Sequence, residues 1–482
     1  MNWKIILYLL GMVLMIIGAF MLLPLIVSIV YGDGDAWGFM ISFIITITAG
    51  FSLALFNRKH RREDLRHRDG FMSVTLIWLV IALFGAMPYL INGTFGGFTE
   101  AYFESMAGFT TTGSSVLTDI EAQPHGILFW RSLTQWLGGM GIVLFSLAIL
   151  PMLGSGGMQL FKAEVPEITI DKLRPRIIDT AKALWYIYAL LTGLAAAMYM
   201  IGGMDAFDAV CHAFTTLATG GFSTKNQSLA FYDSAFIHYV ATVFMFMAGV
   251  NYTLYFFAFR GNLGRIRHSS EFRFYLYMAL GIGLLITFDI VGSEYGSILE
   301  AFRYSIFQTV SIMTTTGYAT ADYEMWSPFA QSLIITIMFF GGMIGSTAGG
   351  MKQIRVLVMI KQIYREIYQL IHPHAVRSLK VDGKNMTKEI LGSIWGFLFL
   401  FILISVVAAV AITATGVDMV TSLSTTISSI CNVGPALGDA GPADNYASLP
   451  VAAKWVLLFC MLTGRLEVYT VIIILVPNFW KK

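Results

Sequence analysis

The chain has 482 residues, of which 56% are hydrophobic and 12% are charged, and its net charge is +2. Soluble globular proteins carry about 25% charged residues, so half that density over long apolar runs indicates an all-α integral membrane protein. The small net charge gives no electrostatic support for a nucleic-acid partner, and the three cysteines have neither a disulfide framework nor a zinc-binding spacing.

Ten apolar runs are long enough to cross a bilayer, which takes about 20 helical residues. They lie near residues 5–30, 37–56, 71–91, 127–151, 182–203, 235–259, 273–292, 327–351, 389–415 and 449–477. The first run is too long for the apolar region of a signal peptide and has no convincing cleavage site, so we interpret it as a membrane helix. An even number of spans places both termini on the same side of the membrane.

Basic residues gather on one side of these spans. Of the 31 Lys and Arg residues, 26 lie near the termini or in segments 58–68, 162–182, 260–273 and 352–388. The positive-inside rule makes this side cytoplasmic. The opposite loops carry carboxylates, at Asp119, Glu121, Asp322, Glu324, Asp439 and Asp444. These carboxylates either concentrate cations at an outer mouth or belong to ordinary solvated loops.

A short segment that ends in a glycine loop occurs four times between spans. The segments are Glu100–Ser115, Asp205–Ser223, Glu300–Thr320 and Asp418–Leu437. Their glycines, Gly113, Gly220, Gly317 and Gly434, are spaced 107, 97 and 117 residues apart. The pattern predicts four copies of helix, half-helix, glycine loop and helix. We expect a two-helix N-terminal unit at 1–70 and repeats at 71–165, 166–270, 271–375 and 376–482.

Four such loops are typical of a cation pore. Non-helical backbone at membrane depth persists only where protein or water satisfies its polar groups. Loops around one axis can point their carbonyl groups inward, and carbonyl rings replace the hydration shell of a potassium ion. Glycine permits backbone angles closed to other residues, and each half-helix directs its partly negative C-terminus toward the ion. One such loop is more simply a structural turn, whereas four copies in register favour a pore.

The motifs TTTGSS, ATGGF, TTTGYAT and CNVGP, each in its own repeat, resemble the four filter loops of the Trk/Ktr/HKT superfamily of potassium transporters. The two extra N-terminal spans are similar to those of the Trk pore subunit of the H or G type, and the resemblance covers the whole chain. It implies a filter for the transported potassium ion made by Thr111, Thr112 and Gly113, by Ala218, Thr219 and Gly220, by Thr315, Thr316 and Gly317, and by Asn432, Val433 and Gly434. Plant members that favour sodium have serine at the first glycine, so Gly113 implies potassium. The fourth loop departs from the TTTG pattern, which implies looser selectivity than in a fourfold-symmetric channel.

The segment Phe339–Gln353 interrupts a predicted span with five glycines. Glycine inside a helix costs about 1 kcal/mol relative to alanine, so a flexible loop is expected. The resemblance implies an intramembrane gate below the filter, made by Gly341, Gly342, Gly345, Ser346, Thr347, Ala348, Gly349, Gly350 and Lys352. The alternative is close helix packing through small residues.

Arg465 lies in the middle of the last predicted span, where a charge costs about 2.5–3.5 kcal/mol. The resemblance implies that it projects into the pore below the filter and repels cations. The alternative is a structural ion pair. Because Glu467 lies only two residues away on the same predicted helix, an ion-pair partner is expected on another segment.

The resemblance also implies a homodimer in the bacterial cytoplasmic membrane and a cytoplasmic ring of nucleotide-binding regulatory subunits of the Trk A type. No Walker or GxGxxG motif lies in a strand–helix context, so no nucleotide site is expected in this chain. Symport with protons or sodium usually places ionisable groups at mid-membrane, and Arg465 is the only clear one, so channel-like passage is favoured over symport. No cluster of a nucleophile, a base or metal ligands indicates an enzyme.

Overall fold

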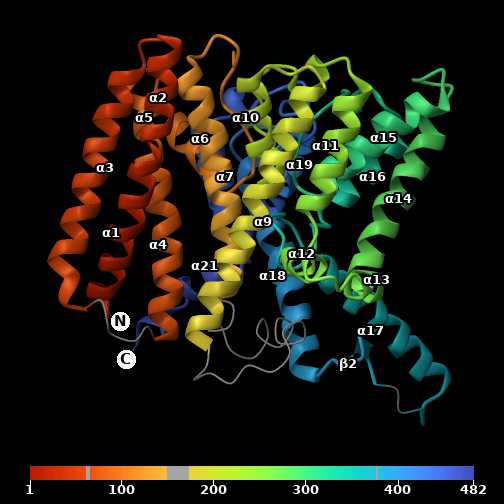
Figure 1. Cartoon of the computed structure of the whole chain (residues 1–482). Helices are drawn as coiled ribbons and strands as arrows, with labels where there is room; N and C mark the ends of the chain where they lie inside the picture. The colour runs from red at the N-terminus through yellow and green to blue at the C-terminus, as the bar shows by residue number, and fades with distance from the viewer. Residues whose placement is uncertain (61–65, 149–172, 376–377, 482) are drawn as a thin grey trace.

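The protein is seen in a computed structural model that describes residues 1–60, 66–148, 173–375 and 378–481. These residues form α-helices joined by loops and short 3-10 turns, with one hairpin between β1 (Lys380–Val381) and β2 (Lys384–Asn385). The long helices stand side by side, and both termini lie at the same end of the bundle (Figure 1). The fold is therefore all-helical, as expected from the sequence.

The first two spans pack against each other at the edge of the bundle. Helices α1 (Trp3–Phe20) and α2 (Leu22–Tyr31) form one span, and α3 (Ala36–Asn57) returns beside it before the 3-10 turn η1 (Arg58–His60). A Cβ atom on Gly11 of α1 would lie 2.6 Å from the backbone nitrogen of Ala54. Small residues thus bring the two backbones together, which stabilises helix pairs in lipid.

Four groups of helices follow, each with a long helix, a short helix, an irregular loop and a further helix. The first group holds α4 (His67–Gly85), α5 (Met87–Ile91), α6 (Phe98–Phe109) and α7 (His125–Ala148). The second holds α9 (Leu173–Ile201), α10 (Ala206–Leu217), η4 (Ser228–Phe231), α11 (Ala235–Ala248), α12 (Tyr252–Phe259) and α13 (Gly264–His268). The third holds α14 (Ser270–Ile290), α15 (Ile298–Met313), η5 (Tyr323–Met325), α16 (Pro328–Met338) and α17 (Gln353–Ile371). The fourth holds α18 (Lys388–Thr413), α19 (Met419–Cys431), η6 (Tyr446–Ser448), α20 (Val451–Arg465), α21 (Tyr469–Leu475) and α22 (Pro477–Trp480).

The short helices α6, α10, α15 and α19 have 12, 12, 16 and 13 residues, which is too few to cross a bilayer. Each begins near an acidic residue, as the sequence predicts. Asp205 and Asp418 cap α10 and α19, accepting backbone N–H groups at 3.0 Å and 2.8 Å. Glu100 and Glu300 lie in the first turns of α6 and α15, where a negative charge interacts favourably with the partial positive charge of the helix N-terminus.

Large apolar side chains cover the outside of the bundle. Phe56, Phe288 and Val410 are 85%, 65% and 65% exposed. Buried positions, in contrast, include many polar residues, above all the threonines and serines of the short helices. A protein that exposes phenylalanine and buries threonine is suited to lipid rather than water.

Most predicted spans coincide with helices of suitable length. Within the described ranges, six helices are long and apolar enough to cross a membrane, or eight if two sharply bent helix pairs each count as one span. The bends measure 96° between α11 and α12 and 119° between α20 and α21. The fourth predicted span, 127–151, falls on α7, but its last residues lie outside the described part. The predicted span 327–351 is interrupted, as the glycines of Phe339–Gln353 predict, because α16 ends at Met338 and α17 begins only at Gln353.

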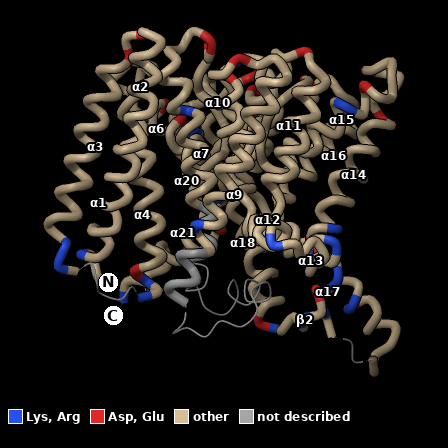
Figure 2. The backbone as a smooth tube through the Cα atoms, viewed as in Figure 1, with Lys and Arg blue, Asp and Glu red and all other residues tan. Residues whose placement is uncertain are grey.

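Charge is distributed unevenly along the bundle axis. Figure 2 shows Lys and Arg gathered at the end that holds both termini, whereas Asp and Glu lie mainly at the opposite end. The separation agrees with the charge pattern of the sequence, although parts of the basic segments 58–68, 162–182 and 352–388 lie outside the described residues. The bundle therefore has a basic end and an acidic end.

Candidate functional site

The four short helices end in the same backbone conformation. The residues Thr111, Thr219, Thr315 and Asn432 have φ angles of 53°, 55°, 57° and 57°. Two positions later, glycines again have positive φ, of 79°, 77°, 80° and 106°, at Gly113, Gly221, Gly317 and Gly434. A β-branched residue at positive φ is a rare outlier, so its recurrence at three threonines shows that the four loops follow one backbone path.

This conformation corrects the predicted register of the second loop. Ala218 is the C-cap of α10, as Thr110 is of α6, so Ala218 ends the helix and does not begin the loop. The counterpart of Gly113 is Gly221, not Gly220 as predicted. The equivalent residues of the second loop are therefore Thr219, Gly220 and Gly221.

The four loops close into a ring. A Cβ atom added to the positive-φ glycine of each loop would collide with a carbonyl oxygen of the next loop. The distances are 2.1 Å from Gly113 to Gly220, 1.9 Å from Gly221 to Thr316, 2.1 Å from Gly317 to Val433 and 2.8 Å from Gly434 to Thr112. Each contact joins one loop to its neighbour, and the fourth returns to the first. Only glycine allows backbone to approach backbone this closely, which explains the residue type at all four positions.

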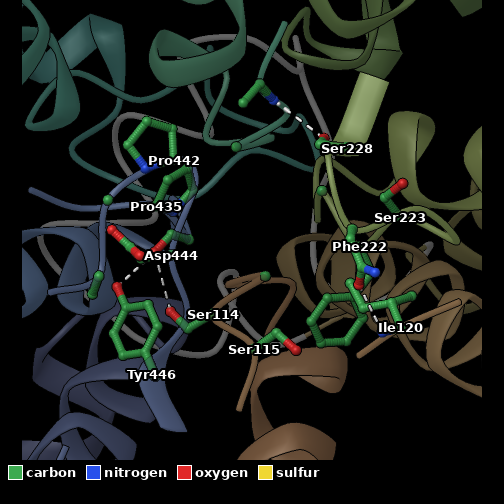
Figure 3. A pocket seen from close by; sticks show the side chains of 18 of the residues that line it. Ser114, Ser115, Ile120, Phe222, Ser223, Ser228, Pro435, Pro442, Asp444 and Tyr446 are labelled. Atoms are coloured by element: carbon green, nitrogen blue, oxygen red, sulfur yellow. Dashed lines mark hydrogen bonds between the residues drawn. The ribbon is translucent and has the colours of Figure 1, made fainter. Parts of the chain in front are cut away.

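A polar hollow of about 90 Å³, with room for several water molecules, lies on the acidic side of this ring, where Asp444 is among its lining residues. All four loops line it, with Gly113, Gly221, Gly317 and Gly434 among the lining residues. Figure 3 shows Ser114 and Tyr446 turned toward the fourth loop, where the Tyr446 hydroxyl donates to the Gly434 carbonyl at 2.6 Å. The hollow is thus a vestibule bordered by backbone and hydroxyl groups and by the charged residues Arg131, Lys225 and Asp444.

Of the six carboxylates expected at the acidic end, Asp444 lines this vestibule. Three others hold loop backbone or side chains. Glu324 accepts the Gly438 N–H at 2.6 Å, and Asp119 and Glu121 accept donors of Asn226 at 3.2 Å and 3.1 Å. Partial burial raises the pKa of Glu324, and the Gly438 N–H opposes that shift. These contacts give three of the predicted carboxylates a structural role in the loops of the acidic end.

The glycine-rich segment, residues 339–352, forms a loop between α16 and α17, as predicted. Gly341 donates to the Met351 carbonyl at 2.9 Å and Met351 donates to the Phe339 carbonyl at 3.1 Å, so the base of the loop is closed. Glu271 of α14 accepts the N–H groups of Ile344 and Ile354 at 2.9 Å and 3.1 Å. One buried carboxylate therefore holds both sides of this loop.

The tip of the glycine-rich segment contacts the helix ends that carry three of the four loops. Gly349 donates to the Thr315 hydroxyl at 2.7 Å, and the Thr347 hydroxyl donates to the Leu217 carbonyl at 3.0 Å. A Cβ atom on Gly349 would lie only 2.4 Å from the Cys431 carbonyl oxygen. These partners lie at the C-terminal ends of the short helices, whereas the vestibule adjoins the glycines that follow. The segment thus lies against the ring on the side opposite the vestibule.

Arg465 joins this segment to α7. It is 2% exposed and donates to the Thr347 carbonyl at 2.8 Å and to the Gly138 carbonyl at 3.1 Å. Lys352 also donates to a carbonyl of the segment, that of Ala348. The ion-pair alternative for Arg465 is not supported among the described residues, where its partners are backbone carbonyls and Glu467 instead pairs with Arg355.

Sequence reasoning missed three residues on one face of α7 that bond to the loops and to Arg465. Arg131, Gln135 and Gly138 lie at intervals of four and three residues, which places them on one face of the helix. Gln135 donates to the Gly220 carbonyl at 2.7 Å and accepts the Phe222 N–H at 3.0 Å. The signal available in the sequence was the presence of two polar residues, Arg131 and Gln135, within the predicted span 127–151. Polar residues inside a membrane span usually mark function.

Comparison with known proteins places these features in context. A family model for TrkH, described as cation transport protein, matches residues 37–482. The chain is similar to the Trk system potassium uptake protein TrkH of Halomonas elongata, with 42% identity over 100% of both chains. It is also similar to TrkH and TrkG of Escherichia coli K12, with 39% identity over 100% and 34% over 99% of both chains. The crystal structure of the potassium transporter TrkH from Vibrio parahaemolyticus has a TM-score of 0.93 and 37% identity, with 100% of both chains covered.

Proposed function

Because this chain belongs to the TrkH family of cation transport proteins, we propose that it takes up potassium ions through a pore lined by the four glycine loops. Its relatives are named potassium uptake proteins, and they are transporters rather than enzymes. The observation that carries the proposal is the closed ring of loops, in which each positive-φ glycine abuts a carbonyl of the next loop. The transported ion in this proposal is potassium.

The proposed filter consists of three residues from each loop. With the corrected register these are Thr111, Thr112 and Gly113; Thr219, Gly220 and Gly221; Thr315, Thr316 and Gly317; and Asn432, Val433 and Gly434. Carbonyl oxygens of these residues would replace water around potassium. Two of the carbonyls already accept hydrogen bonds, at Gly220 from Gln135 and at Gly434 from Tyr446. The carbonyl groups of the second and fourth loops therefore exert a weaker electrostatic field on a bound ion than those of the first and third loops. This difference supports a less selective filter than one with fourfold symmetry.

The proposed gate is the glycine-rich segment, which includes Lys352, together with Arg465. Three features support it. The segment adjoins the inner side of the ring, it has no helical hydrogen bonds between Gly341 and Gly350, and two cationic side chains hold its carbonyls. In this arrangement backbone blocks the path and positive charge repels cations. Opening requires the segment to leave Thr315 and Leu217.

The basic end is the proposed cytoplasmic side of a bacterial inner membrane, with both termini inside. It follows that the vestibule opens outward and the gate lies inward. The relatives belong to Trk systems, so we include a cytoplasmic nucleotide-binding ring of the Trk A type, a homodimer and surrounding lipid in the proposal. The nucleotide site would belong to the ring. The unit boundaries 1–70, 71–165, 166–270, 271–375 and 376–482 stay predictions.

Channel-like passage is the proposed mode, with symport of protons or sodium as the alternative. Of the charged groups that contact the gate segment in the described residues, Arg465 and Lys352 are cationic and Glu271 holds backbone N–H groups. A coupling carboxylate free to titrate along the ion path is the feature that would favour symport. Uptake into proteoliposomes with and without an imposed pH or sodium gradient separates the two modes.

The test of the proposed function is rubidium uptake into proteoliposomes that contain the purified chain, with potassium or sodium as competitor. We expect potassium to compete far better than sodium, and Gly113→Ser to weaken that preference in protein that still elutes as a folded species. No uptake by folded protein, either alone or with the cytoplasmic ring added, would refute the proposal. Equal competition by both ions would refute the potassium filter while leaving a cation pore.

A further inference from the structure

A buried ion pair lies at the seam between the first and second loops. Arg131 of α7 donates from Nε to Oε1 of Glu104 on α6 over 2.8 Å, and the two side chains are 1% and 0% exposed. Among the ion pairs within the described ranges, this one is the most deeply buried. Burial of two charges is unfavourable unless additional hydrogen bonds satisfy both groups, so the surroundings of the pair are informative.

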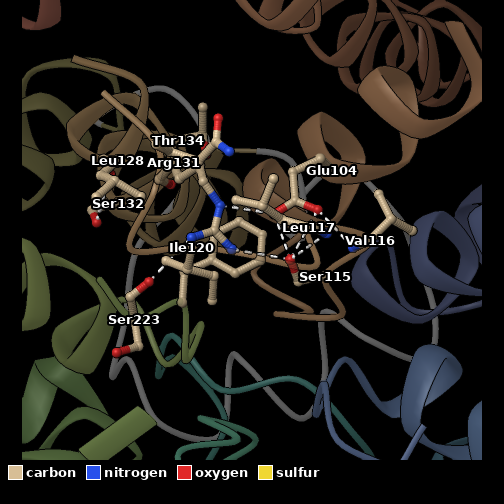
Figure 4. Close-up of polar contacts among 12 residues, drawn as sticks. Glu104, Ser115, Val116, Leu117, Ile120, Leu128, Arg131, Ser132, Thr134 and Ser223 are labelled. Atoms are coloured by element: carbon tan, nitrogen blue, oxygen red, sulfur yellow. Dashed lines mark hydrogen bonds and ion pairs between the residues drawn. The ribbon is translucent and has the colours of Figure 1, made fainter. Parts of the chain in front are cut away.

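Glu104 holds the first loop. Its carboxylate accepts the Ser115 hydroxyl at 2.9 Å and the Val116 N–H at 2.9 Å, and Arg131 Nη2 donates to the same Ser115 hydroxyl at 3.1 Å. Figure 4 shows these groups converging on Ser115. Since Ser115 lies two residues after Gly113, the pair fixes the first loop just outside the ring.

Arg131 holds the second loop with its remaining donor and its flat face. Its Nη1 donates to the Ser223 carbonyl at 3.1 Å, and the guanidinium carbon lies 4.2 Å from the centre of the Phe222 ring. Phe222 directly follows Gly221 in the chain. One rigid, planar group therefore sets the separation between the first and second loops, because all three of its nitrogens bond to fixed partners.

The other seams of the ring are held differently in the described part of the chain. The Tyr318 hydroxyl donates to the His212 carbonyl at 3.0 Å, and the Tyr323 hydroxyl donates to the Ala436 carbonyl at 3.0 Å. At the seam between the fourth and first loops, the Tyr446 N–H donates to the Ser115 carbonyl at 2.8 Å. Further hydrogen bonds support these seams, such as those from the Gly438 N–H to the Glu324 carboxylate at 2.6 Å and from the Asn432 amide to the Thr112 hydroxyl at 2.8 Å. None of these contacts joins two ionised groups, which form the stronger hydrogen bonds. The seam between the first two loops thus differs from the others in the described part of the chain, because an ion-paired guanidinium bridges it.

We propose that Glu104 and Arg131 act as positioning residues that keep the first two loops apart and so favour potassium over sodium. This inference rests on the proposed four-loop filter. A sodium ion is smaller than a potassium ion, and loops that approach each other would coordinate it better. The geometry and field of the coordinating carbonyls decide selectivity, and the guanidinium resists such an approach. Neither residue needs to contact the ion.

Three variants separate positioning from simple stabilisation. Arg131→Lys keeps the positive charge but replaces the planar fork with a point donor that cannot reproduce all three contacts. The double variant E104Q/R131M removes both charges and leaves no unpaired charge in the interior, so it preserves folding better than either single removal. The matched control is Glu100→Gln, the same change one helical turn earlier on α6, where Glu100 pairs with Lys454 at 3.3 Å and not with a loop.

The measurement is rubidium uptake by the full chain in proteoliposomes, with the ratio of the sodium and potassium concentrations that halve uptake as the readout. We expect this ratio to fall by at least about fivefold in Arg131→Lys and in E104Q/R131M, the effect of losing hydrogen bonds to a charged group. Glu100→Gln should leave the ratio within about twofold of the wild type, because Glu100 and Lys454 bond to each other and to Ala447 and share no partner with the filter loops. Thermal unfolding measured in parallel reports the structural cost.

The possible outcomes are distinguishable. Lower thermal stability with an unchanged ratio in both Arg131→Lys and the double variant would overturn the proposal, since the pair would then be structural only. Gly113→Ser serves as the reference in the same assay. If Gly113→Ser changes the ratio and the two ion-pair variants do not, the filter stands and the positioning role is wrong. If none of them changes it, the four-loop filter is itself wrong and the positioning role with it.

Discussion

Gly349→Ala is the substitution that most directly tests whether the glycine-rich segment is a gate. In the observed conformation the new methyl carbon would lie 2.4 Å from the Cys431 carbonyl oxygen and 2.9 Å from the Asn432 Cβ. Contacts below 3.0 Å do not occur for real Cβ atoms, and the nearest neighbour is backbone. The segment must therefore move away from the fourth loop. Because an open segment does not make this contact, the substitution destabilises the closed state selectively.

The size of the effect follows from the packing. Forcing an extra methyl group into a filled interior costs about 1–3 kcal/mol. On a two-state equilibrium that cost raises the ratio of open to closed protein about 5-fold to 150-fold. Uptake of rubidium by the chain alone should rise by a factor in this range, up to the limit set by a fully open pore. The preference for potassium over sodium should stay unchanged, since the filter loops keep their positions.

The assay is rubidium uptake in proteoliposomes at matched protein density, with Gly281→Ala as the control. Gly281 lies in the spanning helix α14 and a Cβ there would meet no atom within 4 Å, so the same change is sterically free. Folded Gly349→Ala with unchanged or lower uptake and unchanged ion preference would refute the gate. A loss of ion preference would show that the fourth loop yields rather than the segment, which would also contradict the reasoning.

Two other predictions follow from the same contacts. Gly221→Ala should abolish uptake, because its φ of 77° and a distance of 1.9 Å to the Thr316 carbonyl both exclude a side chain. Gly220→Ala should lose less uptake, because the three atoms nearest to the new methyl group belong to the Gln135 side chain and not to backbone. Equal loss in both variants would contradict the corrected register. Arg465→Gln should raise basal uptake about tenfold or more, because it removes the charge that donates to Thr347 and Gly138; unchanged uptake by the folded variant would assign Arg465 a structural role only.

The sequence alone predicted the family, the all-helical membrane fold and the four short helices with their glycine loops. Physical constraints made this possible. In lipid the backbone must satisfy its own hydrogen bonds, so a short apolar segment with a terminal glycine has few alternatives to a half-helix and a loop. The acidic starts at Asp205 and Asp418 were equally readable, because a carboxylate at a helix N-terminus has a defined partner.

The features that escaped prediction depend on backbone angles or on distant partners. Two adjacent glycines in the second loop, Gly220 and Gly221, fit the motif equally well by composition, and only the φ angle separates them. The pairing of Glu104 with Arg131 joins residues 27 positions apart on different helices, and no periodicity connects them. The partners of Arg465, which itself was predicted, escaped for another reason. Its partners are carbonyl groups of Thr347 and Gly138, and a backbone acceptor leaves no trace in the residue type.

These contacts also link the proposed filter and the proposed gate into one mechanical unit. On α7, Gln135 donates to the Gly220 carbonyl of the proposed filter, and one turn further Gly138 accepts from Arg465, which also donates to Thr347 of the proposed gate. A movement of the gate that draws Arg465 away from α7 therefore acts on the same helix that positions the second loop. Helices transmit such shifts because the protein interior around them is closely packed. A change in ion preference in a variant that opens the gate by releasing Arg465 should therefore begin at the second loop, and Gln135→Ala should remove that coupling while leaving gating by Arg465 intact.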